Sequence, residues 1–264
     1  MKNTVSICLS IYNQEKIIEQ ILFGILSNAS MNVKEFIILL DGCTDQSAQI
    51  VREIISSVHQ INCKILESND VWETKANNIT FKNATCDYIL TIQDDMLIQE
   101  KDFDQRMFEP FEAIENVFGV SARNAQDETI KDGKLYYFNL AGKDAGIARN
   151  IFAVRDVIIR GPILFHHEIL RSLNYLDEEF APAYAEDKDL SLRAYRQGFL
   201  VGAYAMNYYS PLCWGKARNW GTEKQQFWEK SICKNEQLII ERHSDLLLGN
   251  KHDQDIVIGG GKII

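Results

Sequence analysis

The sequence lacks paired cysteines, although it contains six of them. Structural zinc sites usually take two ligands from a CxxC pair, and no such pair occurs in the chain. The scattered thiols instead indicate free cysteines in a reducing compartment. They are Cys8, Cys43, Cys63, Cys86, Cys213 and Cys233.

Positive charge is also scarce: 28 Lys and Arg face 37 Asp and Glu, for a formal net charge of -9. Nucleic-acid binding draws on clustered Lys and Arg, so we do not expect nucleic acid as a partner. No apolar run approaches the roughly 18 to 20 residues of a membrane span. The N-terminal MKNTVSICLSIYN has no signal-peptide pattern. We therefore expect a cytoplasmic protein, with peripheral attachment at the inner face of a membrane left open.

Two common phosphate-binding motifs are missing as well. No GxGxxG follows the first strand-like run, and no GxxxxGK[ST] occurs anywhere. Their absence argues against a dinucleotide oxidoreductase. A nucleotidyltransferase would have a Gly-rich loop where SIYNQE stands. Nucleotide phosphates would have to be held another way, and carboxylates with magnesium or manganese provide one.

The first hundred residues do contain a regular alternation of two patterns. This alternation predicts an α/β fold with a mostly parallel central sheet and helices on both faces. The 264 residues fit a single domain. Short apolar runs of strand length cover Thr4 to Ile11, Glu35 to Leu40, Cys63 to Ser68 and Asp87 to Ile92, and amphipathic runs cover Gln14 to Ser27, Asp45 to Ser57 and Thr74 to Ala84.

The second half is less regular. A turn at Asp132-Gly133 predicts a hairpin, and the tail from Gly249 shows little pattern. Helices are expected over Phe103 to Asn116, Glu186 to Gln197 and Thr222 to Arg242, and strands over Phe118 to Ala122 and Phe199 to Met206.

Polar side chains follow each of the first four predicted strands, where open α/β sheets bind ligands. They are Ser10, Tyr12 and Asn13; Asp41; Asn69, Glu73 and Lys75; and Gln93, Asp94 and Asp95. Asp41 before Gly42 is also a common turn pair, and the two adjacent aspartates could form a solvated turn. Four polar strand ends at one edge favour a binding site over four unrelated turns.

The segment YAEDKDLSLRAYRQGF allows two interpretations, and both remain open. Glu186, Asp187 and Asp189 lie in the first turn of a predicted helix, where acidic residues favour the positive end of the helix dipole. A carboxylate there could also point into the crevice and act as a general base on a hydroxyl. The short spacing does not say which acid faces the crevice.

Five segments together resemble the family 2 glycosyltransferases. VSICLSIYNQEKIIEQIL, EFIILLDGCTDQSAQIV, DYILTIQDDM, GPILFHHEIL and EDKDLSLRAYRQGF occur in that family's order and spacing, from about Val5 to Tyr209. The resemblance implies a single A-type sugar-nucleotide transferase domain over residues 1–215, with a nucleotide-binding half at 1–100 and an acceptor half at 101–215. Residues 216–264 would form a C-terminal helix and tail packed on it.

The resemblance also implies which residues bind the nucleotide. Ser10 and Tyr12 fall where the family holds the base, and Asp41 matches the aspartate that accepts a hydrogen bond from uracil. Lys75 and Asn78 lie in the segment that borders the nucleotide.

The chemical roles follow in the same way. Asp94 matches the aspartate near the ribose, and Asp95 matches the ligand of a Mn²⁺ or Mg²⁺ ion that bridges the diphosphate. Asp187 matches the catalytic base. Further candidates for acceptor or phosphate contacts are Glu186, Arg160 and His166. Arg binds anions bidentately, although surface ion pairs and structural histidines are the ordinary alternatives.

Two positions depart from the family pattern. Gln93 replaces the first carboxylate of the Asp-x-Asp motif, and the segment NYYSPLCW lacks the histidine that often binds the metal. The protein's share of the metal shell would therefore be small, with diphosphate and water completing it.

The expected activity is transfer of a sugar, with inversion, from a nucleotide-diphospho-sugar to a hydroxyl of a glycan or lipid-linked acceptor. A UDP-sugar is the expected donor, and surface polysaccharide or glycoconjugate synthesis is the expected setting. The alternative is a sugar-nucleotide-binding protein with weak or no catalysis.

Overall fold

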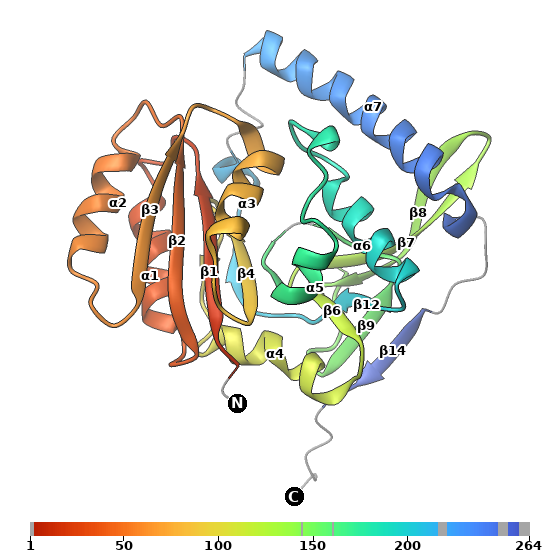
Figure 1. Ribbon diagram of the computed structural model, residues 1–264, viewed down its shortest axis with the longest axis horizontal. Helices are drawn as coiled ribbons and strands as arrows, with labels where there is room; N and C mark the ends of the chain where they lie inside the picture. Colours follow the sequence, from red (N-terminus) through yellow and green to blue (C-terminus); the bar gives the residue numbers. More distant parts are fainter. Residues whose placement is uncertain (1–2, 144, 160, 216–220, 248–252, 259–264) are drawn as a thin grey trace, which may run out of the picture.

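The computed structural model describes residues 3–143, 145–159, 161–215, 221–247 and 253–258. These residues form a central nine-stranded sheet in the order β14-β9-β12-β6-β11-β4-β1-β2-β3 (Figure 1). Seven strands of this sheet run in one direction, and only β9 and β11 run in the other. The predicted α/β fold with a mostly parallel sheet is confirmed.

The first half follows the predicted alternation closely. The strands are β1 (Val5–Ile11), β2 (Val33–Asp41), β3 (Asn62–Ser68) and β4 (Tyr88–Gln93), and the helices are α1 (Ile18–Asn28), α2 (Ser47–Ser56) and α3 (Trp72–Asn83). The apolar runs form strands because parallel strands are covered on both faces and need continuous apolar sequence. Nearly every residue of β1 and β2 is buried accordingly.

Helices cover both faces of the sheet, as expected. Ile7 and Leu9 of β1 pack with α1, α2 and α4 (Phe103–Ala113), whereas Cys8 between them packs with α3, α5 (His167–Ser172) and α6 (Glu186–Arg196). This two-residue alternation is the strand periodicity. Figure 1 shows α1 and α2 on one side of β1 to β3 and α3 on the other.

The second half extends the sheet and adds two small ones. The strands are β6 (Val117–Ser121), β9 (Ile151–Arg155), β11 (Ile163–His166) and β12 (Leu200–Ala203) in the central sheet; β7 (Asn124–Lys131), β8 (Lys134–Gly142) and β10 (Val157–Ile159) in a three-stranded sheet; and β5 (Leu97–Ile98) with β13 (Tyr208–Tyr209). The predicted hairpin joins β7 to β8. Asp132 and Gly133 have φ of 50° and 72°, as tight two-residue hairpin turns require.

The C-terminal part contains the predicted helix and, in the tail, a strand that was not predicted. Helix α7 (Thr222–Leu247) packs against α6 and the β7-β8 hairpin (Figure 1). After it, β14 (Gln254–Val257) pairs antiparallel with β9 and becomes an edge of the central sheet. Its four residues are too short to show a periodicity of their own. Two 3-10 turns, η1 (Glu178–Phe180) and η2 (Leu212–Trp214), complete the elements.

None of the helices in the described ranges combines the length and the apolarity that a membrane crossing requires.

A buried ion pair joins α6 to the hairpin. Lys188 Nζ lies 2.6 Å from Glu128 Oε1, and both side chains are almost fully buried. Gln126 Nε2 donates a further hydrogen bond to the same oxygen, at 2.7 Å. Burial alone would lower the pKa of Lys188, but the charge of Glu128 and the hydrogen bond to it outweigh burial and raise it.

This pair predicts an asymmetric response to mutation. Lys188→Met should destabilise the fold by about 3–5 kcal/mol, because it leaves the Glu128 charge buried without its counter-ion. The double variant Lys188→Met/Glu128→Leu should recover most of that loss. Denaturant unfolding of the two variants measures the difference, and equal destabilisation of both would contradict the assignment.

Candidate active site

The parallel register aligns the ends of four strands at one edge of the sheet. Ser10 pairs with Gln93 of β4, Ile11 with Leu40 of β2, and Asp41 with Ser68 of β3. The polar residues that follow these strands therefore begin from neighbouring positions, as the sequence predicted.

Asp94 is tied to the segment after β1. Its carboxylate accepts hydrogen bonds from Tyr12 N at 2.9 Å and from Gln14 Nε2 at 3.2 Å. The same Nε2 lies 3.2 Å from the carbonyl oxygen of Trp214, which brings η2 to this edge. Burial, with the nearby charges of Asp95 and Glu73, raises the pKa of Asp94 to about 7 despite these hydrogen bonds. A carboxyl group in this environment favours a proton or a cation beside it.

Glu73, at the start of α3, connects two groups of acids. Its Oε1 accepts a hydrogen bond from Gln93 Nε2 at 2.9 Å. Its charge contributes to the raised pKa of both Asp94 and Glu186. The start of α3 therefore lies between the end of β4 and the start of α6. Glu73 was among the polar residues that the sequence placed after the third strand, without an assigned role, whereas Gln14 was not predicted and its only signal was its place after the first strand.

The start of α6 supplies Glu186 and Asp187. Glu186 is buried, and its Oε2 has no hydrogen-bond partner within the part of the chain that the structure describes. Burial, followed by the charges of Asp187 and Glu73, raises the pKa of Glu186 well above its ordinary value. Asp187 is less buried, and its Oδ1 accepts a hydrogen bond from Lys188 N at 2.8 Å.

The backbone before α6 is strained. Tyr184 and Ala185 have φ of 85° and 72°, a region that side-chain-bearing residues rarely adopt. Such conformations persist only where surrounding contacts hold them, and they concentrate at functional sites. The strain coincides here with the turn that presents the two acids.

Among the predicted nucleotide contacts, Ser10 and Tyr12 lie at this edge and are partly exposed. Lys75 is exposed on α3. The Ser10 hydroxyl lies 3.5 Å from Asn77 Oδ1, so the end of β1 also approaches the exposed part of α3.

Asp41 has a structural role, the alternative that its place before Gly42 had left open. Its Oδ1 accepts hydrogen bonds from Ser68 Oγ at 2.7 Å and Val71 N at 2.8 Å, and its Oδ2 accepts one from Trp72 N at 3.0 Å. It is buried, so it holds the start of α3 against the end of β2. The following Gly42 has φ of 64°, and a Cβ there would lie 2.7 Å from Asp70 N, so this turn requires glycine.

Asn78 is likewise buried by structural contacts. Its Nδ2 donates to Leu176 O at 2.9 Å and to Glu178 Oε1 at 3.1 Å, and its Oδ1 accepts from Leu176 N at 3.0 Å. Both amide hydrogens are used, and the side chain is 2% exposed. The structure therefore places Asn78 against the segment after α5 rather than at the nucleotide edge.

His166 lies away from the other candidates. Strand β11 runs antiparallel to β4, so His166 pairs with Tyr88 at the opposite end of β4 from Gln93. Burial lowers the pKa of His166, and its ring packs 5.1 Å from that of Tyr88. The predicted contact with acceptor or phosphate does not agree with this placement. Arg160 lies outside the described residues.

The acidic edge offers carboxylate oxygens, the ligands that Mg²⁺ and Mn²⁺ prefer. No group of three or more such side chains within the described ranges is placed to bind one ion. Asp94 and Asp95 therefore fit an ion that takes one or two protein carboxylates and completes its shell from substrate phosphates and water.

The sequence model described as Glycosyl transferase family 2 matches residues 6–173, more than half of the chain. The chain belongs to this family. The matched part of this family 2 chain includes the acids at the end of β4 and the start of α3. It ends before α6, so Glu186, Asp187 and α7 lie beyond it.

Solved structures share this fold at low sequence identity. S. aureus TarS 1–349 in complex with UDP is 17% identical, with a TM-score of 0.56 over 93% of this chain and 69% of that one. The mannosyltransferase PcManGT from Pyrobaculum calidifontis, in complex with GDP-Man and Mn²⁺, is 16% identical, with a TM-score of 0.55 over 76% and 56%. GalNAc-T7 with UDP, GalNAc and Mn²⁺ is 8% identical, with a TM-score of 0.68 over 90% and 47%.

The family 2 chain spans only part of these proteins. In another structure of S. aureus TarS 1–349 the match covers 60% of that fragment, and in TarS itself 37%. No curated protein matches the chain in sequence.

The raised pKa of Glu186 predicts a loss of stability as the pH rises. The folded protein keeps this proton at pH values where the unfolded chain, with a Glu pKa of 4.5, has released it. This contribution to the free energy of unfolding is complete below pH 4.5 and is lost as the pH rises through the pKa that Glu186 has in the folded protein. The raised pKa of Asp94 has the same effect between pH 3.8 and about pH 7.

Glu186→Gln should therefore melt at a higher temperature than the wild type near pH 8, and the difference should shrink toward pH 4.5. Differential scanning calorimetry measures the two melting temperatures. A chelator is present so that no bound cation alters the ionisation of the acids. A variant whose advantage is equal at both pH values would show that folding does not raise the pKa of Glu186.

Proposed function

We propose that this protein is an inverting glycosyltransferase. It would transfer a sugar from a nucleotide-diphospho-sugar, with a UDP-sugar as the favoured donor, to a hydroxyl of a glycan or lipid-linked acceptor. The observation that carries the proposal is the convergence of acids from three elements at one sheet edge of a family 2 chain: Glu73 from α3, Asp94 and Asp95 after β4, and Glu186 and Asp187 from α6.

The donor would bind across the ends of β1 and β4. Ser10 and Tyr12 are partly exposed there and would hold the base, and Asp94 beside Tyr12 N would lie near the ribose. Lys75 is exposed on α3 and would border the phosphates. Asp41 already accepts three hydrogen bonds, two at Oδ1 and one at Oδ2, so Oδ2 would accept the further hydrogen bond from a base. The structures with UDP and UDP-GlcNAc favour UDP, whereas the mannosyltransferase with GDP-Man keeps GDP as a second choice.

Asp95 would hold a Mn²⁺ or Mg²⁺ ion together with the donor diphosphate and water. Such an ion supplies neutralisation of the negative charge that develops on the departing diphosphate. Gln93 carries no charge, and its side chain donates a hydrogen bond to Glu73. The metal ligands that the protein supplies would therefore be Asp95, with Asp94 beside it.

Asp187 would act as the general base. It would accept the proton of the acceptor hydroxyl while that oxygen attacks the anomeric carbon on the face opposite the diphosphate, which inverts the configuration. Asp187 is more exposed than Glu186, which suits a base that must reach a substrate. Burial raises the pKa of Glu186 above its ordinary value, so Glu186 would keep a proton and donate a hydrogen bond to the acceptor.

Asp187→Asn should lower turnover by roughly two to four orders of magnitude, the usual effect of removing a general base. Donor affinity should change little, because the amide keeps the shape of the carboxylate. Initial rates of nucleotide release and calorimetric donor binding measure the two quantities. An equal loss of donor affinity would instead make Asp187 a cap of α6.

A thermal-shift panel of UDP-, GDP- and dTDP-sugars with and without Mn²⁺ identifies the donor, because a ligand that binds only the folded state raises the melting temperature. For Asp95→Ala we expect the metal-dependent part of this shift to disappear while any metal-independent part remains. A shift with Mn²⁺ equal to that of the wild type would remove Asp95 from the metal site.

Gln93 supports one alternative, a sugar-nucleotide-binding protein with weak or no catalysis, because it removes a charge from the metal motif. Donor binding in the panel without sugar transfer or donor hydrolysis would favour that alternative. The proposed setting is surface polysaccharide or glycoconjugate synthesis in the cytoplasm, at or near the inner face of the membrane.

A further inference from the structure

Asn235, in the middle of α7, is completely buried against the segment that leads into α6. Its Nδ2 lies 2.7 Å from the carbonyl oxygen of Phe180, 3.1 Å from that of Ala183 and 2.8 Å from that of Tyr184. One amide group of α7 thus gathers three backbone carbonyls of a single loop.

The chemistry of these partners fixes the orientation of the amide. Carbonyl oxygens only accept hydrogen bonds, so the nitrogen of Asn235 must face them, and its two hydrogens are shared among three acceptors. Its Oδ1 finds no hydrogen-bond partner in the described residues. A buried acceptor without a partner costs stability. Asn235 therefore stabilises the loop through its amide nitrogen, which donates to the three carbonyl oxygens.

The loop held by Asn235 is the one that presents the two acids of α6. It contains the left-handed residues Tyr184 and Ala185, directly before Glu186 and Asp187. Two further residues take part in hydrogen bonds of this loop: Thr74 of α3 donates through N and Oγ1 to Pro182 O, at 3.2 Å each, and the Tyr184 hydroxyl donates to Glu236 Oε1 of α7 at 3.0 Å. Among the described residues, helix α7 therefore takes part in most of the side-chain hydrogen bonds of this strained turn.

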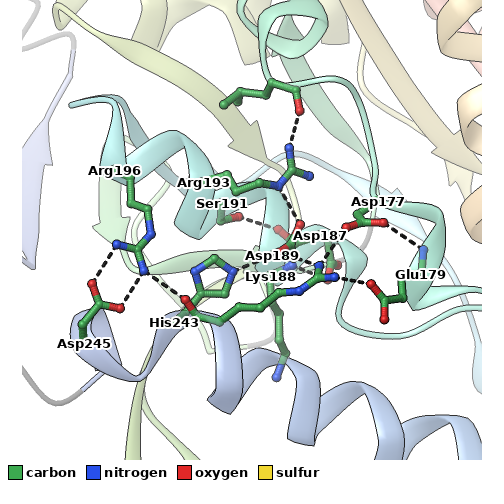
Figure 2. A network of polar contacts seen from close by, with 12 residues as sticks. Asp177, Glu179, Asp187, Lys188, Asp189, Ser191, Arg193, Arg196, His243 and Asp245 are labelled. Carbon is green, nitrogen blue, oxygen red and sulfur yellow. Dashed lines mark hydrogen bonds and ion pairs between the residues drawn. The ribbon is translucent and has the colours of Figure 1, made fainter.

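Helix α7 is also fixed to α6 itself (Figure 2). Asp189 Oδ1 lies 2.9 Å from His243 Nε2, and its Oδ2 lies 2.6 Å from Arg193 Nε. Arg242 of α7 reaches toward Asp189, at 3.8 Å, and binds Asp177 at 2.7 Å. Burial would raise the pKa of Asp189, but the hydrogen bonds from His243 and Arg193 lower it, so the carboxylate is held ionised inside the interface.

We propose that Asn235 is a positioning residue, which acts through the backbone of residues 180–184 to hold Glu186 and Asp187 in the geometry that sugar transfer needs. The inference rests on the proposed function of those two acids. It assigns a role to α7, which lies outside the part of the chain that the family model matches. Misplacement of a catalytic group by about 1 Å can cost on the order of a hundredfold in rate.

The test compares Asn235→Leu, which keeps the branched shape and the number of side-chain heavy atoms but removes the donors, with Leu247→Ala. Leu247 lies twelve residues further along α7 and is buried in the apolar cluster that also contains Leu192 and Ile239, so its truncation should destabilise the helix while the hydrogen bonds to the loop carbonyls remain. Activity is nucleotide release from the sugar nucleotide that the wild type turns over with Mn²⁺, measured well below the melting temperature of each variant.

For Asn235→Leu we expect a fall in kcat of about tenfold or more, donor binding within about twofold of the wild type, and faster hydrogen exchange at amides 183–187. Leu247→Ala should lower the melting temperature and keep kcat. Equal kcat losses in both variants, or unchanged exchange at 183–187 in Asn235→Leu, would overturn the positioning role.

Asn235→Ala provides a second variant in case Asn235→Leu does not fold, because it removes the same donors without adding bulk to the buried site. It should also lower kcat with unchanged donor binding, and an unchanged kcat would contradict the inference. A wild type that binds donor without turnover would refute the proposed function and this inference together, whereas an active wild type with an equally active Asn235→Leu refutes the inference alone.

Discussion

The site depends first on the parallel hydrogen bonding of β1, β2, β3 and β4. Parallel pairing places the carboxyl ends of all four strands at one edge of the sheet, with Ser10 beside Gln93 and Asp41 beside Ser68. Strands buried on both faces carry mostly apolar side chains along their length, so polar groups collect where the strands end. The same pairing that buries the core thus concentrates functional groups at this edge.

Bringing these acids together costs free energy, and the raised pKa values of Asp94 and Glu186 are a measure of that cost. Glu186 is buried, Asp94 is partly buried, and both lie near other acids, so the folded protein without ligand holds them in a state that favours protonation. A cation or a substrate hydroxyl would relieve this unfavourable arrangement. Asp189, in contrast, is buried with His243 and Arg193 and is stabilised as a carboxylate. The chain therefore separates acids that serve stability from acids that stay available for ligands, although they lie within three residues of each other in α6.

The sequence predicted best where local pattern and tertiary environment agree. The first four strands and three helices, and the hairpin turn at Asp132-Gly133, follow from periodicity and turn chemistry. It predicted least where the answer depends on the direction of a strand or on distant partners. Because β11 runs antiparallel, His166 lies at the far edge, and Asn78 is buried because Leu176, about a hundred residues away, takes its amide. Neither strand direction nor such a partner leaves a mark in the local sequence.

The role of α7 shows why such partners matter for the site. A loop with two consecutive left-handed residues cannot hold its shape by apolar packing alone, since packing has no direction and tolerates small shifts. Hydrogen bonds to fixed carbonyls do have direction, and Asn235 supplies them from within a helix that is itself anchored to α6 by Asp189. The geometry of the two acids at the start of α6 is therefore set jointly by the sheet, through α3 and Thr74, and by the C-terminal helix.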